Sequence, residues 1–168
     1  MRFILLTHSR ELSKNTGTGS LVALALKENC DVIIWSRTQP DLKLTEMLIP
    51  EETLLIYPKK EVEGAEEKNI KINIEWPQTR YKTFVVLDGT WQEARKIYNK
   101  SPYLHDLNSH TLQVNYASNY QLRRNQKGDG LCTAEVVLEL LKRQQQEKEF
   151  VILNEYFSQH NTKVKVKI

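Results

Sequence analysis

The sequence contains only two cysteines, six glycines and five prolines in 168 residues, and it has no long hydrophobic run. Cys30 and Cys132 are too few for a disulfide framework or for the four ligands of a structural zinc ion. Few glycines and prolines, together with 40% hydrophobic residues, exclude a disordered chain and indicate a sizeable core. No apolar run approaches the roughly 20 residues that cross a bilayer, and the apolar start Phe3–Leu6 is too short for a signal peptide. We therefore expect one cytoplasmic domain spanning residues 1–168, with no membrane partner.

The formal net charge of +3 lies entirely in the second half of the chain. Residues 1–84 contain twelve basic and twelve acidic side chains, whereas residues 85–168 contain twelve basic and nine acidic ones. A mild, one-sided basic excess permits a nucleic-acid partner without requiring one.

Short apolar runs alternate with helical patterns along the chain. The expected strands are Phe3–Leu6, Val32–Trp35, Thr53–Tyr57, Phe84–Leu87 and Leu112–Val114. The expected helices are Ser20–Glu28, Leu42–Leu48 with Asp41 as its cap, Trp91–Lys100, Ala134–Gln146 and Glu149–His160. This alternation predicts an α/β fold, a mostly parallel sheet covered by helices.

Two segments depart from the alternation. Residues 59–75 are highly charged with both signs, which is typical of a long surface connection. The basic tail, residues 162–168, alternates Lys with Val or Ile from Lys163 onward. That pattern suits an edge strand or a frayed basic end.

The most informative segment runs from the end of a buried strand, through Gly89, directly into a helix. Ligands of open α/β sheets bind at such strand ends, near the positive ends of helices. Asp88 ends the strand, and a buried carboxylate needs either polar partners or a function; capping the next helix is the simpler explanation. Thr90 and Glu93 also fit a capping box.

Three further features remain open at this level. Trp91 faces the core or forms the floor of a pocket. The loop Asn15–Ser20 is a plain turn or a place where backbone amides approach a ligand. Glu135 stabilises the start of its helix or takes part in a site, and Cys132 beside that start could have a lowered pKa, although a nucleophilic role is not expected.

Taken together, these segments resemble the DTW-domain family, which is named for an Asp-x-Thr-Trp motif. The motif is present as Asp88-Gly89-Thr90-Trp91. The other matching blocks, in family order, are Asn15–Gly17, Trp35–Pro40, Glu93–Lys96 with Lys100–Pro102, Tyr120–Arg123 and Leu131–Val136. The ordered set covers most of the chain between Thr7 and Leu141.

The resemblance implies a tRNA-uridine aminocarboxypropyltransferase related to the knotted SPOUT enzymes, with a C-terminal trefoil knot. Such enzymes transfer the 3-amino-3-carboxypropyl group of S-adenosylmethionine (SAM) to a uridine in tRNA, forming 3-(3-amino-3-carboxypropyl)uridine. Many members carry a cysteine-rich, zinc-binding segment before the first strand. The sequence starts at that strand, so neither zinc nor another metal is expected.

The resemblance also implies roles for individual residues. Asp88 is expected to be the catalytic base or the partner of the donor's ammonium group, and Arg37 or Arg123 to pair with the donor's carboxylate. The expected SAM-binding residues are Ser36, Arg37, Leu87, Thr90, Trp91, Leu131, Thr133 and Glu135. The expected RNA contacts are Arg10, Lys14, Arg95, Lys96, Arg123 and Arg124.

Two alternatives remain beside this reading. One is a SAM-dependent RNA methyltransferase of the SPOUT type, which would present a different arm of the same donor. The other is a non-catalytic RNA-binding module that keeps the fold and leaves SAM unconsumed.

Overall fold

Five parallel strands form one sheet in the order β2-β1-β4-β3-β5. The computed structural model describes residues 1–57, 76, 81–120 and 130–165. The strands are β1 (Arg2–Thr7), β2 (Cys30–Ile34), β3 (Thr53–Ile56), β4 (Thr83–Asp88) and β5 (Asn108–His110). The expected parallel sheet is therefore confirmed.

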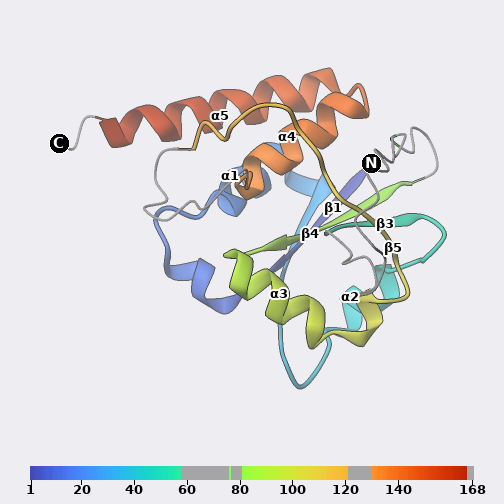
Figure 1. Ribbon diagram of the computed structural model, residues 1–168. Coiled ribbons are helices and arrows are strands. Elements are labelled where there is room, and N and C mark those ends of the chain that lie inside the picture. The colour runs from blue at the N-terminus through green and yellow to red at the C-terminus, as the bar shows by residue number, and fades with distance from the viewer. Residues whose placement is uncertain (58–75, 77–80, 121–129, 166–168) are drawn as a thin grey trace, which may run out of the picture.

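Helices cover both faces of this sheet. They are α1 (Gly19–Leu26), α2 (Leu42–Met47), α3 (Trp91–Asn99), α4 (Thr133–Arg143) and α5 (Glu147–Lys165), with short 3-10 helices η1 (Ser9–Ser13), η2 (Lys27–Asn29) and η3 (Pro102–Leu104). Figure 1 shows α1, α4 and α5 on one side of the sheet and α2 and α3 on the other. The helices and sheet thus form three layers.

The central strand β4 explains why its sequence is apolar without alternation. Phe84 and Val86 belong to the core beneath α1, α4 and α5, whereas Val85 and Leu87 belong to the core beneath α2 and α3. All four side chains are buried because a parallel sheet with helices on both faces has no solvent-facing side. The strand ends at Asp88, which marks the carboxyl edge of the sheet.

Local signals fix the helix ends, at the predicted residue for the start of α2 and before the predicted residue for the end of α4. Asp41 caps α2 by accepting a hydrogen bond from the Leu44 amide at 3.0 Å. α4 ends at Arg143, three residues before the predicted end, because Gln145 adopts a left-handed conformation with φ of 55°. The amides of Gln145 and Gln146 then close the helix by donating to the carbonyls of Lys142 and Leu141.

The structure contradicts one predicted strand and the edge-strand alternative for the basic tail. The fifth strand is Asn108–His110, paired with Leu54–Ile56, and not the more apolar Leu112–Val114. Leu112 instead packs against the core, so its apolar character reflects side-chain burial rather than a strand. The tail from Thr162 to Lys165 continues α5 and forms no edge strand. The charged connection 59–75 lies outside the described residues.

Candidate functional site

A cavity of about 340 Å³ opens at the carboxyl edge of the sheet, between α3 and α4. Its size falls at the lower end of the range for small-molecule sites. The residues that line it are Ile56, Tyr57, Val86, Leu87, Gly89, Trp91, Ala94, Thr111, Leu112, Gly130, Leu131, Thr133 and Val136. None of these lining residues is charged, so the described wall suits a neutral, largely apolar group.

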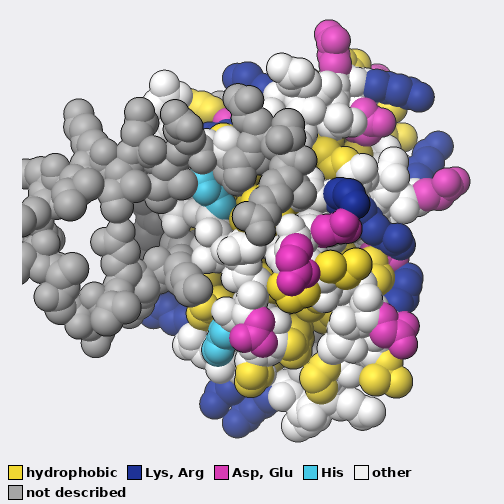
Figure 2. Space-filling model, turned by 90° about the vertical axis from the view of Figure 1, so that its right-hand side faces the viewer, with side chains coloured by type: hydrophobic (Ala, Val, Ile, Leu, Met, Phe, Trp, Pro, Cys, Tyr) yellow, Lys and Arg dark blue, Asp and Glu magenta, His cyan; other side chains and the backbone are white. Residues whose placement is uncertain are grey.

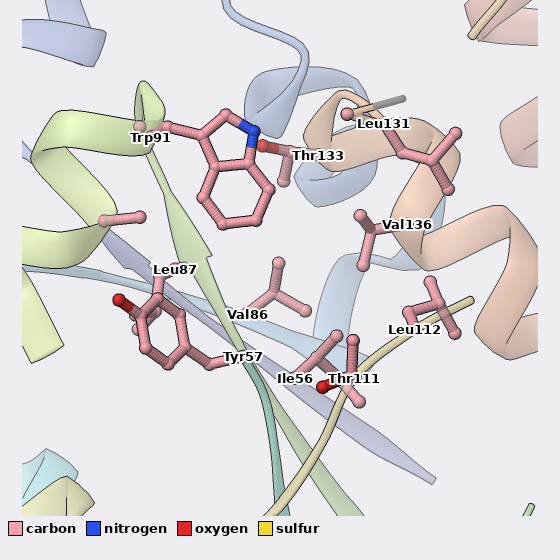
Figure 3. Close-up of a pocket in the computed structure, with 13 residues that line it drawn as sticks. Ile56, Tyr57, Val86, Leu87, Trp91, Thr111, Leu112, Leu131, Thr133 and Val136 are labelled. Atoms are coloured by element: carbon pink, nitrogen blue, oxygen red, sulfur yellow. The ribbon is translucent and has the colours of Figure 1, made fainter. Parts of the chain in front are cut away.

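Two aromatic side chains shape one side of the cavity. Trp91, the first residue of α3, is 55% exposed and faces Leu131 and Val136 across the space (Figure 3). A Cβ atom at Gly130 would lie 2.8 Å from the indole Nε1, so only glycine lets this loop approach Trp91 so closely. Tyr57 stacks on Tyr98 with ring centroids 4.5 Å apart. Of the two predicted positions for Trp91, the structure therefore supports the pocket.

α3 starts beside this cavity with the predicted capping box. Thr90 Oγ1 accepts from the Glu93 amide at 3.2 Å, and Glu93 Oε2 accepts from the Thr90 amide at 2.8 Å. Their side chains thus satisfy two backbone donors that a helix start leaves unpaired. The cap fixes the direction of the first turn, which carries Trp91.

The carboxylate of Asp88 lies at the end of β4, beneath the first turns of α1 and α4. It is 5% exposed, and it accepts hydrogen bonds from Thr133 Oγ1 at 2.7 Å and from Thr7 Oγ1 at 3.2 Å. Leu87, Gly89 and Thr133 line the cavity, but Asp88 is absent from the described lining. The polar partners that a buried carboxylate needs are therefore two threonine hydroxyls from β1 and α4.

A second group of buried charges lies beside Gly89. The ammonium of Lys14 pairs with Glu11 and lies 3.6 Å from Glu93 Oε2, while His8 Nδ1 is 3.9 Å from Glu93 Oε1. Burial alone would raise the pKa of Glu93, but the Thr90 amide, Lys14, Glu11 and His8 together hold it below its ordinary value. Glu93 is therefore held in its charged form.

The start of α4 depends on Glu135 and on the strap, the extended segment of residues 111–120. Glu135 accepts from the Cys132 amide at 2.9 Å, from Ser118 Oγ at 2.6 Å and from the Asn119 amide at 2.6 Å. Burial, reinforced by Glu135, raises the pKa of Cys132 to about 12. The lowered pKa considered for Cys132 is thus wrong, and the structure gives Glu135 the role of a helix cap and loop anchor.

The structure gathers some of the predicted SAM-binding residues and separates others. Leu87, Trp91, Leu131 and Thr133 line the cavity. Thr90 and Glu135 cap the two helices that flank it. Ser36 and Arg37 are exposed on the loop after the edge strand β2, away from the described lining.

The predicted RNA contacts also differ in their surroundings. Arg10, Arg95 and Lys96 are exposed, whereas the Lys14 ammonium is engaged by two carboxylates. Arg123 and Arg124 lie outside the described residues. On the face shown in Figure 2, basic side chains lie next to acidic ones over much of the surface.

Sequence reasoning missed several wall residues. Tyr57 ends a predicted strand, so the rule that ligands bind at strand ends could have identified it. Thr111 and Leu112 could not be found in this way, because they lie just before and at the start of the predicted strand Leu112–Val114, and the structure places both in the strap. Their place in the wall follows from tertiary structure alone.

Among the described residues, no group of three or more His, Cys, Asp or Glu side chains is arranged to hold a metal ion. No helix within the same residues is long and apolar enough to cross a membrane.

The chain that builds this cavity matches a known protein family over most of its length. The DTW domain matches residues 1–165. A protein of Drosophila melanogaster named tRNA-uridine aminocarboxypropyltransferase 2 is 28% identical over 144 residues, covering 83% of this chain and 55% of its own. Proteins of the same name from Macaca fascicularis and Mus musculus are each 28% identical over 145 residues, covering 83% of this chain and 47% of their own.

The chain spans about half the length of these curated relatives. No solved structure matches it significantly. The match to the family extends over nearly the whole chain and includes both flanks of the cavity. On that ground, the chain is a member of the DTW domain family.

Proposed function

We propose that this protein transfers the 3-amino-3-carboxypropyl group of SAM to a uridine in tRNA, forming 3-(3-amino-3-carboxypropyl)uridine. The observation that carries the proposal is the family match over residues 1–165, which includes relatives named for this activity. The convergence of the Asp88–Trp91 and Leu131–Val136 segments at one cavity supports it. In the proposed reaction a bond forms between the uracil imide nitrogen and the γ-carbon of the donor, that carbon's bond to sulfur breaks with its electron pair staying on sulfur, and the imide proton is released.

The cavity fits the neutral, planar part of SAM. Its wall is mostly apolar. The polar groups of the described wall are the side chains of Tyr57, Trp91, Thr111 and Thr133 and the backbone around Gly89 and Gly130, which can hydrogen-bond to ring nitrogens. We propose that Leu87, Trp91, Leu131 and Thr133 hold the adenosine, as the family resemblance implies. The described wall contains no charged side chain, so the charged amino-acid end must lie toward the rim.

We propose that charged side chains outside the described wall orient the amino-acid end of the donor. Arg37 and Arg123 stay the proposed partners of its carboxylate, and Ser36 a neighbouring contact. Holding one arm against the acceptor base selects which carbon next to the sulfonium reacts, because positioning rather than intrinsic reactivity distinguishes the three arms.

We propose that exposed basic side chains bring the tRNA to the cavity. Arg10, Arg95 and Lys96 are exposed on η1 and α3, where they can reach phosphates, and Arg123 and Arg124 complete the proposed set. The Arg95 side chain also hydrogen-bonds to Tyr57, which lines the cavity. Lys14 would contribute less, since two carboxylates already neutralise its ammonium.

The same proposal includes one domain over residues 1–168, a cytoplasmic location and a SPOUT-like knot. The strap supports the knot because it lies along α4, a helix that follows it in the chain. Arg143 donates to the Gln113 carbonyl at 2.7 Å, and the Tyr116 hydroxyl donates to Glu139 at 2.8 Å. In a knot, the chain that contains α4 passes through a loop formed by the preceding chain. An experimental structure in which α4 does not pass through such a loop would contradict the knot.

The reaction is tested by incubating the protein with unmodified tRNA and SAM and analysing the nucleosides by mass spectrometry. We expect one uridine to gain about 101 Da, which is the mass of the transferred arm less the displaced hydrogen, and a gain of about 14 Da would indicate methyl transfer instead. tRNA that binds but stays unmodified, with SAM unconsumed, would support a non-catalytic RNA-binding module and contradict the proposal.

A further inference from the structure

We infer that Asp88 is a positioning residue: its carboxylate fixes the first turn of α4 through Thr133, and thereby the wall of the cavity. The inference rests on the proposed function for its link to SAM, and on the structure alone for its link to α4. It differs from the expectation that Asp88 is the base, which requires the carboxylate to reach a substrate.

The hydrogen bonds of Asp88 carry the first step. Oδ1 accepts from the Thr133 hydroxyl at 2.7 Å. Oδ2 lies 3.2 Å from the Thr7 hydroxyl, whose single proton is shared with the Leu5 carbonyl at 3.3 Å, so Thr133 is the stronger of the two donors. Thr7 ends β1 at the position paired with Asp88 across the sheet, whereas Thr133 begins α4. The carboxylate therefore connects the sheet edge to a helix that lies 45 residues further along the chain.

Packing around the carboxylate carries the second step. A Cβ atom at Gly19 would lie 2.4 Å from Asp88 Oδ2, so the first residue of α1 covers the carboxylate closely. The neighbouring Thr18 Oγ1 accepts from the Ala134 amide at 3.1 Å, which ties α1 to the same turn of α4. Solvent access is therefore small, and Asp88 is 5% exposed.

The buried carboxylate of Asp88 needs its hydrogen-bond donor. A buried ionised group that loses a donor is strongly destabilised, because water cannot replace the donor. α4 is consequently held where Thr133 can donate, and Thr133 itself lines the cavity (Figure 3). Asp88 thus acts on the cavity from behind its wall.

The test compares Asp88→Asn, Thr133→Val and Thr133→Ser. Asn keeps the shape of the side chain but not its charge, Val keeps the shape of Thr133 without the donor, and Ser keeps the donor. We expect Asp88→Asn and Thr133→Val each to weaken SAM binding about tenfold by calorimetry without tRNA, and the double variant to be no weaker than the weaker single variant. Thr133→Ser should bind SAM within about twofold of the original protein.

Kinetics separate positioning from direct chemistry. In Asp88→Asn and Thr133→Val, we expect kcat/KM for SAM to fall more than kcat does. The pH profile of kcat should keep its position in these two variants and in Thr133→Ser. Thr45→Val on α2, which removes an exposed hydroxyl remote from the cavity, serves as the control and should change neither value. The inference would be overturned if Asp88→Asn bound SAM normally but its kcat fell about a thousandfold or more, while Thr133→Val stayed active. That result would identify Asp88 as a base.

Hydrogen–deuterium exchange keeps the inference testable if the protein neither binds SAM nor modifies tRNA. In that case the proposed function fails, but the clamp on α4 can still be measured in the protein alone. We expect the amides of Ala134 and Val136 to exchange faster in Asp88→Asn and Thr133→Val than in the original protein and in Thr45→Val. Unchanged exchange at these amides would overturn the positioning role.

Discussion

Thr90 and Glu93 each bond through the side chain to the other's backbone amide, at 3.2 and 2.8 Å. This reciprocal pair closes the first turn of α3, so the turn that presents Trp91 to the cavity is fixed by two residues that are close in sequence. The pair gives the first two predictions.

Replacing Thr90 by alanine removes one half of the cap. We expect Thr90→Ala to lower the free energy of unfolding by about 1 kcal/mol, measured by urea denaturation, because the Glu93 amide loses its acceptor. Thr90→Ser keeps the hydroxyl and should stay within about 0.5 kcal/mol of the original protein. Equal stability of Thr90→Ala and Thr90→Ser would show that the cap contributes nothing.

Replacing Glu93 by glutamine should change how stability depends on pH. The pKa of Glu93 is lower in the folded protein than its ordinary value of 4.5, so its charge stabilises the fold above about pH 4.5 and this contribution is lost as the pH falls through the folded-state value. Glu93→Gln should therefore be less stable than the original protein at pH 7, and the difference should narrow below pH 4.5. The readout is the free energy of unfolding between pH 3 and pH 7.

The control for this titration is Glu46→Gln, which changes an exposed carboxylate on α2. It should leave the pH dependence as it is. A stability difference for Glu93→Gln that stays constant across the range would show that the hydrogen-bonding shape of the side chain matters and its charge does not.

The turn between α4 and α5 gives a stabilising substitution. Gln145 has a φ of 55°, a conformation that costs a residue with a side chain more than it costs glycine. We expect Gln145→Gly to raise the free energy of unfolding by about 0.5–1 kcal/mol, since the smaller strain outweighs the added flexibility of the unfolded chain. Gln144→Gly, at a φ of −90°, is the matched change and should destabilise.

The proposed RNA surface on α3 is tested by salt dependence. If Lys96 contacts a phosphate, Lys96→Ala should weaken tRNA binding and lower the slope of log affinity against log salt by about 1. Lys148→Ala removes an exposed lysine from α5, on the other side of the sheet, and should leave the slope unchanged. Identical slopes for Lys96→Ala and the original protein would remove Lys96 from the interface.

Features encoded over a few residues could be predicted from the sequence. Asp41 and Thr90 signal helix starts through residues three positions away, and the apolar run Phe84–Leu87 signals a strand buried on both faces. The last strand could not be predicted, because Asn108 and Ser109 are polar and pair with β3 only at its edge. Its existence depends on the neighbouring strand rather than on its own composition.

The candidate site divides along the same line. Its place at the end of β4 follows from the strand–glycine–helix pattern. The contacts that define it join Asp88 to Thr7 and Thr133, which are 81 and 45 residues away, and no local pattern reports a pair so far apart. The role of the strap could not be predicted either. The sequence Leu112–Val114 favours a strand, whereas in the structure Leu112 lines the cavity.

The all-parallel order of the sheet has a consequence for how the chain folds. In a parallel sheet, no two neighbouring strands can be joined by a tight turn, and even the nearest partners in sequence, Phe3 and Cys30, are separated by a complete helix. The pairing of β1 with β4, in which Arg2 lies opposite Thr83, joins residues that are still further apart in the sequence. Each pairing closes a long loop, and the chain entropy is lost before any sheet contact offsets it. We therefore expect a folding time of about milliseconds or longer, compared with the microseconds of small helical bundles.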